Sequence, residues 1–164
     1  MAIAVGTNTA LLDDPELSTR LWPGKSPVRI IVDMDLRLPS SLKLFDATIP
    51  TIVFNAKQNT IEDIKATLQP GVHYYQITKD VSLVQQMLQA LYRMNIQSVF
   101  VEGGATLLQS FINEGLWDEA RVITNEELMI GEGLPAPQLG RCRLLHTEKI
   151  LSDTVRIYQP IEVS

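Results

Sequence analysis

The segment from Gly6 to Arg20 carries side chains that could bind a ligand. It reads Gly-Thr-Asn-Thr-Ala-Leu-Leu-Asp-Asp-Pro-Glu-Leu-Ser-Thr-Arg and begins at the end of residues 2–6, which predict a buried strand. Its small residues allow close backbone approach, Thr9 and Asp13 offer hydrogen bonds, and Arg20 can hold an anion through two parallel N–H groups. A plain polar turn, in which the Asp-Pro pair starts a helical turn and the arginine is solvated, is the alternative interpretation.

A second candidate lies at residues 101–108, where Val-Glu-Gly-Gly-Ala-Thr-Leu-Leu passes from a strand pattern directly into a helix pattern. The glycine pair permits a tight turn that brings free helix N–H groups toward a phosphate. The three-glycine fingerprint of Rossmann domains does not occur in this segment. Glu102 stands at the carboxyl end of the strand, where open α/β sheets bind ligands. A turn without a ligand and an exposed or capping glutamate remain the alternatives.

These segments need a scaffold of strands to position them. Short β-branched runs bounded by Pro, Gly, Asp or Asn predict buried strands. They lie at residues 28–33, 51–55, 72–77, 98–102 and 120–124. Two of the strands end in a polar residue, Asp33 and Asn55, at the position where such strands place ligand-facing groups. Residues 144–151 and 154–161, joined by Ser152-Asp153, predict a closing antiparallel hairpin.

Helices are predicted between the strands. Ser82 opens a capping box, and the apolar stripe that follows it predicts a helix packed on a sheet. A second stripe over residues 107–112 ends near Gly115. Residues 60–63 could begin a short helix that ends at Pro70-Gly71. The whole of residues 1–164 is therefore interpreted as one α/β domain, with a largely parallel sheet, flanking helices and an antiparallel edge.

Composition limits the functions that this scaffold could serve. The chain has 164 residues, with 14 Lys+Arg against 19 Asp+Glu and a net charge of −5. This balance argues against a nucleic-acid-binding domain, which normally carries a basic face. The apolar runs are far shorter than the roughly 20 residues that span a bilayer, so no membrane partner is expected. Cys142 is the single cysteine, so we expect no disulfide framework, no metal site and a reduced, cytoplasmic setting.

Taken together, the two candidate segments resemble the reductase domain of bacterial riboflavin biosynthesis, the C-terminal half of a bifunctional pyrimidine deaminase/reductase. That family shows Gly-x-x-Thr-x-x-x-Asp-Asp-Pro-x-Leu-x-x-Arg after a strand, matched here from Gly6 to Arg20. It later shows Val-Glu-Gly-Gly-x-Thr-Leu, matched at residues 101–107, and then an Asp-Glu pair, matched at residues 118–119. The order and separation also match, and the similarity covers essentially the whole chain.

The resemblance implies a dihydrofolate-reductase-like fold and an NADPH-dependent oxidoreductase. The implied reaction reduces 5-amino-6-(5-phosphoribosylamino)uracil to 5-amino-6-(5-phosphoribitylamino)uracil, with hydride transfer to C1′ of the opened sugar. A homodimer, formed through a sheet edge or the region of Trp117, is also implied. No residue of the chain stands out as a general acid, so no catalytic residue is predicted.

The resemblance also implies roles for individual positions. Leu17, Arg20 and Glu102 match substrate contacts, with Arg20 suited to the ribose phosphate. The matched cofactor contacts are Thr9, Asp13, Gly104, Ala105, Thr106, Leu107, Leu108, Gln109 and Ser110. After the strand at residues 28–33 the family often has a Ser or Thr that touches NADPH. This chain has Met34 there, so a contact at this position would run through the backbone.

Two departures from the family pattern matter. The zinc ligands of the deaminase half do not occur in these 164 residues. The family's reductase domain also begins several tens of residues earlier, with a strand segment that lines both pockets, so we expect that this chain lacks it. Two alternatives to the leading interpretation therefore stay open. One is a catalytically incomplete nucleotide-binding or assembly domain, and the other is a different reductase of the same fold.

Overall fold

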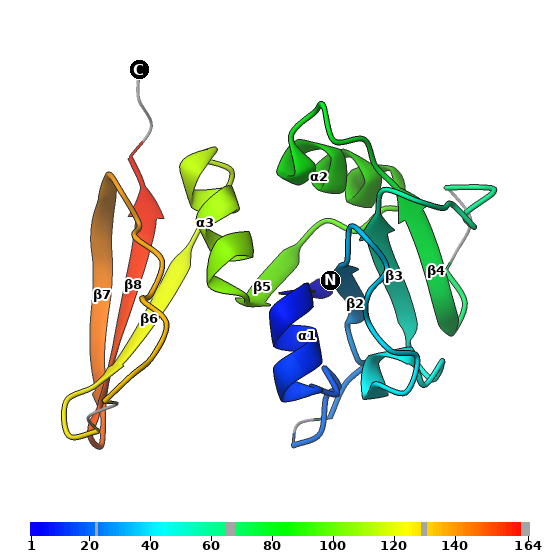
Figure 1. Ribbon diagram of the computed structural model, residues 1–164. Helices are drawn as coiled ribbons and strands as arrows, with labels where there is room; N and C mark the ends of the chain where they lie inside the picture. The colour runs from blue at the N-terminus through cyan, green and yellow to red at the C-terminus, as the bar shows by residue number, and fades with distance from the viewer. Residues whose placement is uncertain (22, 65–67, 129–130, 162–164) are drawn as a thin grey trace. The chain divides into compact units, whose positions relative to one another are not determined.

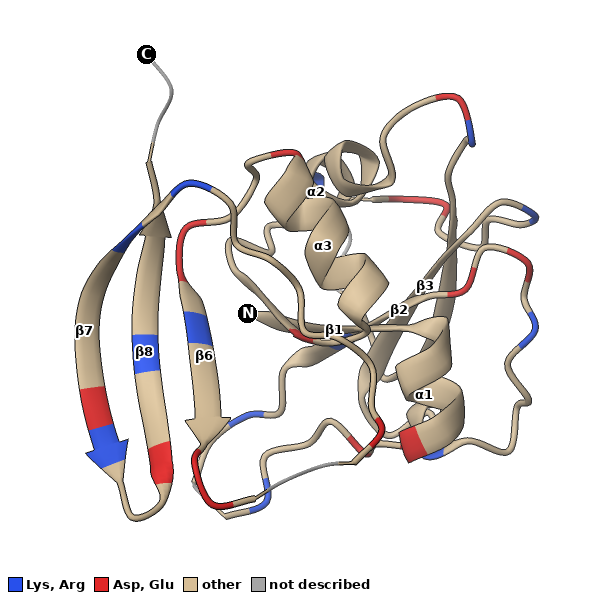
Figure 2. Cartoon of the chain, turned by 60° about the vertical axis from the view of Figure 1, so that its left-hand side comes forward, with Lys and Arg blue, Asp and Glu red and all other residues tan. Residues whose placement is uncertain are grey.

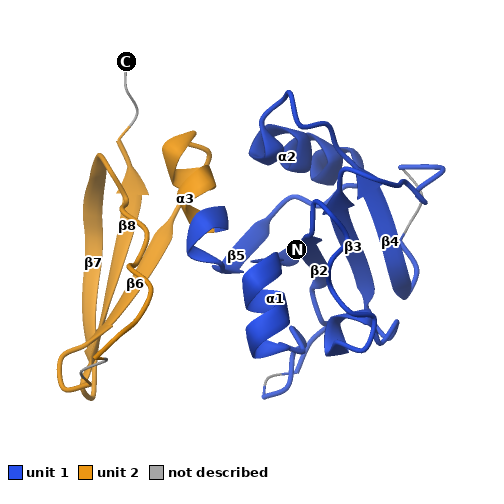
Figure 3. Ribbon diagram, viewed as in Figure 1, with its two compact units in different colours: residues 1–107 blue, residues 108–164 orange. Residues whose placement is uncertain are grey.

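The chain forms two compact units, residues 1–107 and residues 108–164, shown in blue and orange in Figure 3. The computed structural model describes residues 1–21, 23–64, 68–128 and 131–161. Each unit has a β-sheet of its own. Among the described residues, no helix combines the length and the apolar character that crossing a bilayer demands.

Unit 1 is built on a parallel sheet of five strands in the order β4-β3-β2-β1-β5 (Figure 1). All four neighbouring pairs run parallel. The strands are β1 (Ala2–Gly6), β2 (Val28–Val32), β3 (Pro50–Asn55), β4 (Gly71–Gln76) and β5 (Val99–Gly103). Each lies within two residues of a predicted strand. The expectation of a largely parallel sheet is confirmed.

The central strands of this sheet are buried on both faces. Val5, Ile31 and Val53 pack with Ala10 on one face. Their neighbours along the strands point to the opposite face and are just as inaccessible to solvent: Ala4, Ile30, Ile52 and Phe54. Burial on both faces is the usual state of a parallel sheet, whose crossover connections run over the faces, and it explains the continuous β-branched runs in the sequence.

The first candidate segment contains a helix that we did not predict. α1 (Thr7–Asp13) follows β1 directly and ends before the Asp-Pro pair, whereas the turn interpretation placed the start of a helix there. Asp14 ends the helix in the left-handed region, with φ of 41°. This placement follows from the proline, which disfavours helical geometry in the residue before it. The segment is thus a helix followed by a loop at residues 14–20.

The other predictions for unit 1 had mixed outcomes. α2 (Leu83–Arg93) begins as predicted, because the Ser82 hydroxyl accepts a hydrogen bond from the Gln85 N–H at 3.2 Å. The helix expected from residue 60 is wrong through residue 64, and residues 65–67 lie outside the described part of the chain. Thr60 instead pairs with Tyr74 of β4, through both its backbone N–H and its hydroxyl at 2.9 Å. A short 3-10 helix, η1 (Lys43–Phe45), lies between β2 and β3.

Unit 2 holds an antiparallel sheet of three strands in the order β6-β8-β7. These are β6 (Ala120–Asn125), β7 (Cys142–Ile150) and β8 (Asp153–Pro160). The predicted hairpin is confirmed as β7 and β8, and Leu151 makes the turn with φ of 57°. α3 (Ala105–Asn113) starts in unit 1 and continues into unit 2.

Candidate functional site

The carboxyl ends of β1 and β5 meet at the point where the strand order of the sheet reverses. From β1 the chain proceeds through β2, β3 and β4 on one side, and β5 then adds to the other side of β1 (Figure 1). Open α/β sheets bind ligands in the crevice at such a switch point. Gly6 ends β1 there, and Gly103 ends β5. The two segments singled out from the sequence therefore meet in space.

The glycines at this junction allow an approach that other residues would block. A Cβ on Gly103 would lie 2.8 Å from Cγ2 of Thr9, closer than such atoms can come. Gly104 has φ of 89°, and its Cβ would lie 3.5 Å from Cα of Gly6. The glycine pair thus packs directly against β1 and against Thr9 of α1. This contact brings the first predicted cofactor residue beside the predicted phosphate-binding turn.

α3 begins immediately after this turn, so its first N–H groups, which have no partner within the helix itself, lie at the switch point. Ala105 and Leu107 supply two of these donors. Gln109, also predicted as a cofactor contact, directs its side chain elsewhere. Its amide nitrogen donates to the Gln138 carbonyl at 3.2 Å, and its amide oxygen accepts from the Gln138 N–H at 2.9 Å. Any cofactor contact of Gln109 would therefore come from its backbone.

The two polar strand ends have different surroundings. Asp33 is 2% exposed, and its Oδ2 accepts the Leu38 N–H at 2.9 Å. Oδ1 of Asp33 is buried with no hydrogen-bond partner among the described residues. Asn55 instead closes a turn, with its Oδ1 accepting the N–H groups of Lys57 and Gln58, both at 2.8 Å. The ligand-facing interpretation of Asn55 is wrong, because its polar atoms serve the local backbone.

The backbone carbonyl after Asp33 also has a partner. The Met34 carbonyl accepts the Ala56 N–H at 3.0 Å. A backbone contact between Met34 and a cofactor would therefore have to share the Met34 carbonyl oxygen with Ala56 or use the Met34 N–H group.

A cavity of about 470 Å³ lies in unit 1 beside the loop that follows α1. Leu17, Arg20 and Glu102, the three predicted substrate contacts, all line it, together with Asp13. Arg20 and Glu102 make no hydrogen bond or ion pair with any other described residue, so their charged groups are free for a ligand. The structure thus gathers around one space the residues that the family motif names far apart in the sequence.

An irregularity in the sheet sets the position of Glu102. Ala4 of β1 pairs with Val101, but the next residue, Val5, pairs with Gly103. Glu102 is therefore the extra residue of a bulge, a device that redirects side chains beside active sites. It is exposed at an edge strand rather than buried between strands. Its position at the strand end was readable from the sequence, whereas the bulge was not.

The loop at residues 14–20, called the cavity loop from here on, holds two residues in backbone conformations that favour glycine. Asp14 has φ of 41° and Leu17 has φ of 49°. Leu17 is 9% exposed and packs in the same core cluster as Val5 and Ala10. Such strain persists only where the surrounding structure holds it, and it concentrates at ligand-binding sites. The buried Leu17 side chain fixes the loop against the sheet.

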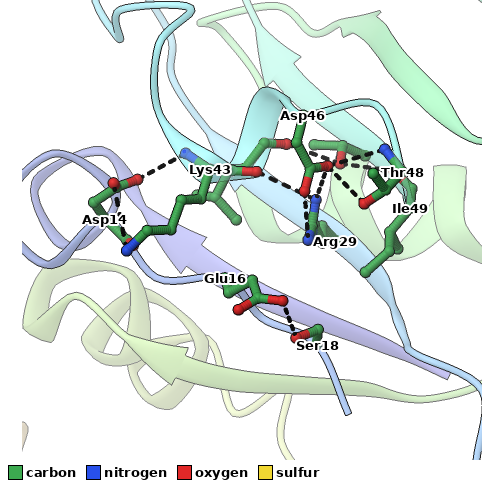
Figure 4. Close-up of polar contacts among 10 residues, drawn as sticks. Asp14, Glu16, Ser18, Arg29, Lys43, Asp46, Thr48 and Ile49 are labelled. Atoms are coloured by element: carbon green, nitrogen blue, oxygen red, sulfur yellow. Dashed lines mark hydrogen bonds and ion pairs between the residues drawn. The ribbon is translucent and has the colours of Figure 1, made fainter. Parts of the chain in front are cut away.

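Lys43 lines the cavity too, and the sequence patterns did not reveal it. Its backbone N–H donates to Oδ1 of Asp14 at 2.8 Å, and its Nζ lies 3.7 Å from Oδ2 of the same carboxylate (Figure 4). No local signal marks this lysine, because it belongs to the loop between β2 and β3 and reaches the cavity only through the fold.

A buried ion pair lies behind Lys43. Arg29 of β2 is fully buried, and its guanidinium donates to Oδ1 of Asp46 at 2.7 Å (Figure 4). The same guanidinium lies 3.5 Å from the Lys43 carbonyl. The pKa of Asp46 is lowered to about 2, chiefly because its carboxylate accepts the Arg29 hydrogen bond. Desolvation of the carboxylate acts in the opposite direction but is the smaller effect. The pair ties the loop at residues 43–46 to the sheet.

The charged side chains around the cavity are predominantly acidic. Figure 2 shows an acidic residue at the end of α1, where the cavity loop begins. Among the lining residues, the carboxylates are Asp13, Asp14, Glu16 and Glu102, and the cations are Arg20 and Lys43. No group of three or more His, Cys, Asp or Glu side chains in the described residues is arranged to hold a metal ion. The cavity can thus accept both hydrogen-bond donors and an anionic group.

Known proteins are similar to this chain in sequence and in fold. The family model described as the RibD C-terminal domain matches residues 1–155. A riboflavin biosynthesis protein RibD of Aquifex aeolicus is 39% identical over 141 residues, which are 85% of this chain and 38% of that protein. A 2,5-diamino-6-ribosylamino-4(3H)-pyrimidinone 5′-phosphate reductase of Methanothermobacter thermautotrophicus is 34% identical over 124 residues, 74% of this chain and 57% of that protein.

Solved structures agree with the sequence comparison. A deaminase/5-amino-6-(5-phosphoribosylamino)uracil reductase of Thermotoga maritima superposes with a TM-score of 0.78 at 26% identity, over 98% of this chain and 45% of that one. A riboflavin biosynthesis reductase of Saccharomyces cerevisiae has the same fold, with a TM-score of 0.73 at 24% identity, over 96% of this chain and 74% of that one. The predicted dihydrofolate-reductase-like fold class is confirmed. The two motifs and the parallel sheet agree with the match over residues 1–155, and the chain belongs to the RibD C-terminal domain family.

Proposed function

We propose that the protein reduces a phosphorylated ribosylaminopyrimidine with NADPH, converting 5-amino-6-(5-phosphoribosylamino)uracil to its ribitylamino product. The observation that carries this proposal is the cavity in which Leu17, Arg20 and Glu102 surround one space. Relatives named as reductases of a ribosylaminopyrimidinone 5′-phosphate support the same class of substrate. The chain spans about 38% and 57% of two relatives that it matches, so their activities are extended to it as part of this proposal.

Each cavity residue has a role that suits this substrate. Arg20, which has no hydrogen-bond or ion-pair partner among the described residues, binds the 5′-phosphate through two N–H groups, the geometry in which guanidinium binds most strongly. Glu102 accepts hydrogen bonds from the amino and hydroxyl groups of the substrate. Leu17 provides the apolar contact and, being anchored in the core, keeps the loop in place. Together these residues fix both ends of an elongated polar molecule.

The junction of β1, β5 and α3 fits a nicotinamide dinucleotide. The glycine pair gives a backbone surface without side chains, and the first N–H groups of α3 face a site suited to phosphate. Oδ1 of Asp33, at the adjacent carboxyl end of β2, has no hydrogen-bond partner in the described part of the chain and can accept a hydrogen bond from a ribose hydroxyl. Thr9 and Asp13 complete the proposed contacts. When bound, NADPH supplies the hydride for C1′ of the opened sugar.

The protein's own contribution is then mainly positioning. Holding a donor and an acceptor in reactive geometry can supply on the order of 7–11 kcal/mol in favourable cases. The parallel sheet suits this task, because the buried strands β1 and β2 hold α1 and the cavity loop on a rigid base. We assign the catalytic effect to this alignment and not to a single acid or base.

The proposal extends to assembly and location. A homodimer agrees with the apolar side chains that unit 2 exposes, among them Ile123 at 67% and Ile150 at 50%. Light scattering of the purified protein tests it, and a monomeric mass at all concentrations would contradict it. A cytoplasmic location agrees with the free thiol of Cys142, since reducing compartments keep such thiols unpaired.

A substrate panel tests the proposed reaction. Oxidation of NADPH is followed with 5-amino-6-(5-phosphoribosylamino)uracil, with the 2,5-diaminopyrimidinone analogue, with the dephosphorylated compound and with dihydrofolate. We expect turnover with the first two and a large loss without the phosphate. Turnover of dihydrofolate alone would identify a different reductase of the same fold. Tight NADPH binding without any turnover would favour a nucleotide-binding or assembly domain.

Arg20→Gln sharpens this test. Removing the guanidinium should raise the KM for the phosphorylated substrate about tenfold or more and leave the KM for NADPH nearly unchanged, because a lost charged hydrogen bond weakens binding by roughly 1.5–3 kcal/mol. A collapse of NADPH affinity instead would move Arg20 from the substrate site to the cofactor site.

A further inference from the structure

Lys43 is one of two cationic side chains that line the cavity, and the family motif does not include it. The cavity also holds four carboxylates, Asp13, Asp14, Glu16 and Glu102. A dianionic phosphate next to these groups is repelled unless nearby cations compensate them. With Arg20 alone, four carboxylates against one cation would leave three negative charges in excess on the lining side chains, and Lys43 reduces this excess to two, so the second cation favours the binding of an anion here.

The contacts of Lys43 hold it at the cavity wall. Its backbone N–H donates to Oδ1 of Asp14 at 2.8 Å, which fixes the main chain of the lysine to the loop after α1. Its Nζ lies 3.3 Å from the Asp14 carbonyl and 3.7 Å from Oδ2. The side chain is 61% exposed, so the ammonium group can exchange this loose ion pair for a ligand oxygen without being drawn out of the core.

The backbone beneath Lys43 is rigid, which separates it from an ordinary surface lysine. Arg29, fully buried, reaches the Lys43 carbonyl at 3.5 Å and Asp46 at 2.7 Å. The following residue, Leu44, is itself fully buried. Opposite this wall, Asp14 is held in the left-handed region with φ of 41°. Two strained or anchored loops thus meet at the ion pair, a pattern typical of ligand clamps.

We propose that Lys43 is a second cationic ligand for the phosphate of the substrate, and that Asp14 is the positioning residue that holds it at the cavity. The assignment rests on the proposed function, because it deepens the account of how that site binds its substrate. It predicts that the phosphate lies between Arg20 and Lys43. In the absence of ligand, Asp14 takes the place of the phosphate as the partner of the ammonium group.

The chain offers a matched control for this proposal. Lys79 forms an exposed ion pair with Asp35 at 3.6 Å, with 68% of its side chain exposed, and it does not line the cavity. Lys43→Gln and Lys79→Gln therefore remove the same charge from similar surface pairs. Lys43→Arg keeps the charge, and the exposure of both lysines makes all three variants compatible with folding.

Two measurements are made on each variant with the full protein: kcat and the KM values for the phosphorylated substrate and for NADPH, and inhibition by ribose 5-phosphate. We expect Lys43→Gln to raise both the KM and the inhibition constant about tenfold, with kcat within about twofold, because a charged hydrogen bond is lost. Lys43→Arg should recover most of this loss. Lys79→Gln should match the wild type, and inhibition by ribose without phosphate should be equal in all variants.

The outcomes separate this assignment from the proposed function. Unchanged constants in Lys43→Gln, while Arg20→Gln loses affinity, overturn the role of Lys43 and leave the proposed function standing. A rise in the KM for NADPH alone shows that Lys43 serves a phosphate of the cofactor, and also overturns it. If the wild type neither turns over the substrate nor is inhibited by ribose 5-phosphate, the proposed function fails and the Lys43 assignment fails with it.

Asp14→Asn tests the positioning role separately. The amide keeps an acceptor for the Lys43 N–H but removes the charge that competes with the phosphate. If Asp14 acts through Lys43, the KM of Asp14→Asn for the phosphorylated substrate should differ from that of the wild type. Adding Asp14→Asn to Lys43→Gln should then leave the KM of Lys43→Gln nearly unchanged. Equal effects in both backgrounds would contradict the coupling. Asp35→Asn is the matched control, since Asp35 pairs with Lys79.

Discussion

The two units of the chain are stabilised in different ways. In unit 1 the central strands are inaccessible to solvent, as Ala4, Ile30 and Ile52 show. In unit 2 every residue of β7 after Cys142 is exposed. Among the described residues of the antiparallel sheet, only Thr154 is buried. A parallel sheet needs crossovers that cover its faces, whereas an antiparallel hairpin can form from adjacent segments with little cover.

This difference explains where the chemistry lies. The cavity and the glycine junction both belong to unit 1, where packed strands hold their ends in place. Binding and catalytic groups need such support, because small displacements weaken their effect. Unit 2 relies on backbone pairing and on polar turn contacts, such as Asn125 with Asp153 at 2.6 Å. We expect equivalent changes to have unequal effects in the two units.

The largest contrast is expected from matched isoleucine truncations. Ile31 is fully buried in β2, and Ile150 of β7 is 50% exposed. Ile31→Ala should lower the free energy of unfolding by about 2–5 kcal/mol, because it removes packed methyl groups and leaves a cavity. Ile150→Ala should cost less than about 1 kcal/mol. Denaturant unfolding measures both, and similar losses would contradict the comparison.

Two ion pairs of equal length provide the next contrast. Arg29–Asp46 and Arg121–Glu119 both measure 2.7 Å, but the Arg29 side chain is 0% exposed and that of Arg121 is 64% exposed. Asp46→Ala should destabilise the protein by about 3 kcal/mol, because it leaves a buried guanidinium without its counter-charge. Glu119→Ala should change stability by about 0.5 kcal/mol or less. A large effect of Glu119→Ala in unfolding experiments would show that unit 2 depends on its surface charges.

Glycine substitutions test the junction of β1 and β5. A Cβ on Gly103 would meet Cγ2 of Thr9 at 2.8 Å, whereas a Cβ on Gly131 of unit 2 would meet nothing within 4 Å. Gly103→Ala should cost about 1–3 kcal/mol from overpacking and should raise the KM for NADPH. Gly131→Ala should be close to neutral. Thr9→Ser, which removes Cγ2 and keeps the hydroxyl, should restore part of the stability of Gly103→Ala, and no restoration would argue against this contact.

Acid titration gives the smallest expected effect. The pKa of Asp46 falls from 3.8 to about 2 in the folded protein, chiefly through the Arg29 hydrogen bond. A carboxyl group whose pKa is lowered by folding stabilises the folded protein at pH values above its pKa in the unfolded state. For Asp46 this contribution is lost as the pH falls from about 4 to 2. The Asp46 side chain is 35% exposed, so solvent screening reduces the effect to about 1 kcal/mol. Unfolding of wild type and Asp46→Asn over this range should show a smaller pH dependence in the variant.

Most strands and two of the helices could be predicted from local sequence. Buried strands such as β2 and β3 show continuous β-branched runs, and Ser82 caps α2 as its pattern predicts. α1 was missed because its seven residues, Thr-Asn-Thr-Ala-Leu-Leu-Asp, are too few to form a recognisable apolar stripe. The helix expected at residue 60 was wrong up to residue 64, because Thr60 pairs with the outer strand β4.

The residue types of the site were determined by the sequence alone. The spacing from Gly6 to Arg20 and the Val-Glu-Gly-Gly segment predict a ligand loop and a phosphate-binding turn, because few other residues combine the backbone freedom of glycine with the charges of arginine and a carboxylate. The tertiary structure decided which of them meet. The strand order brings Gly103 to Thr9, a bulge redirects Glu102, and a loop from elsewhere adds Lys43. These contacts depend on the packing of distant segments, for which local sequence carries no signal.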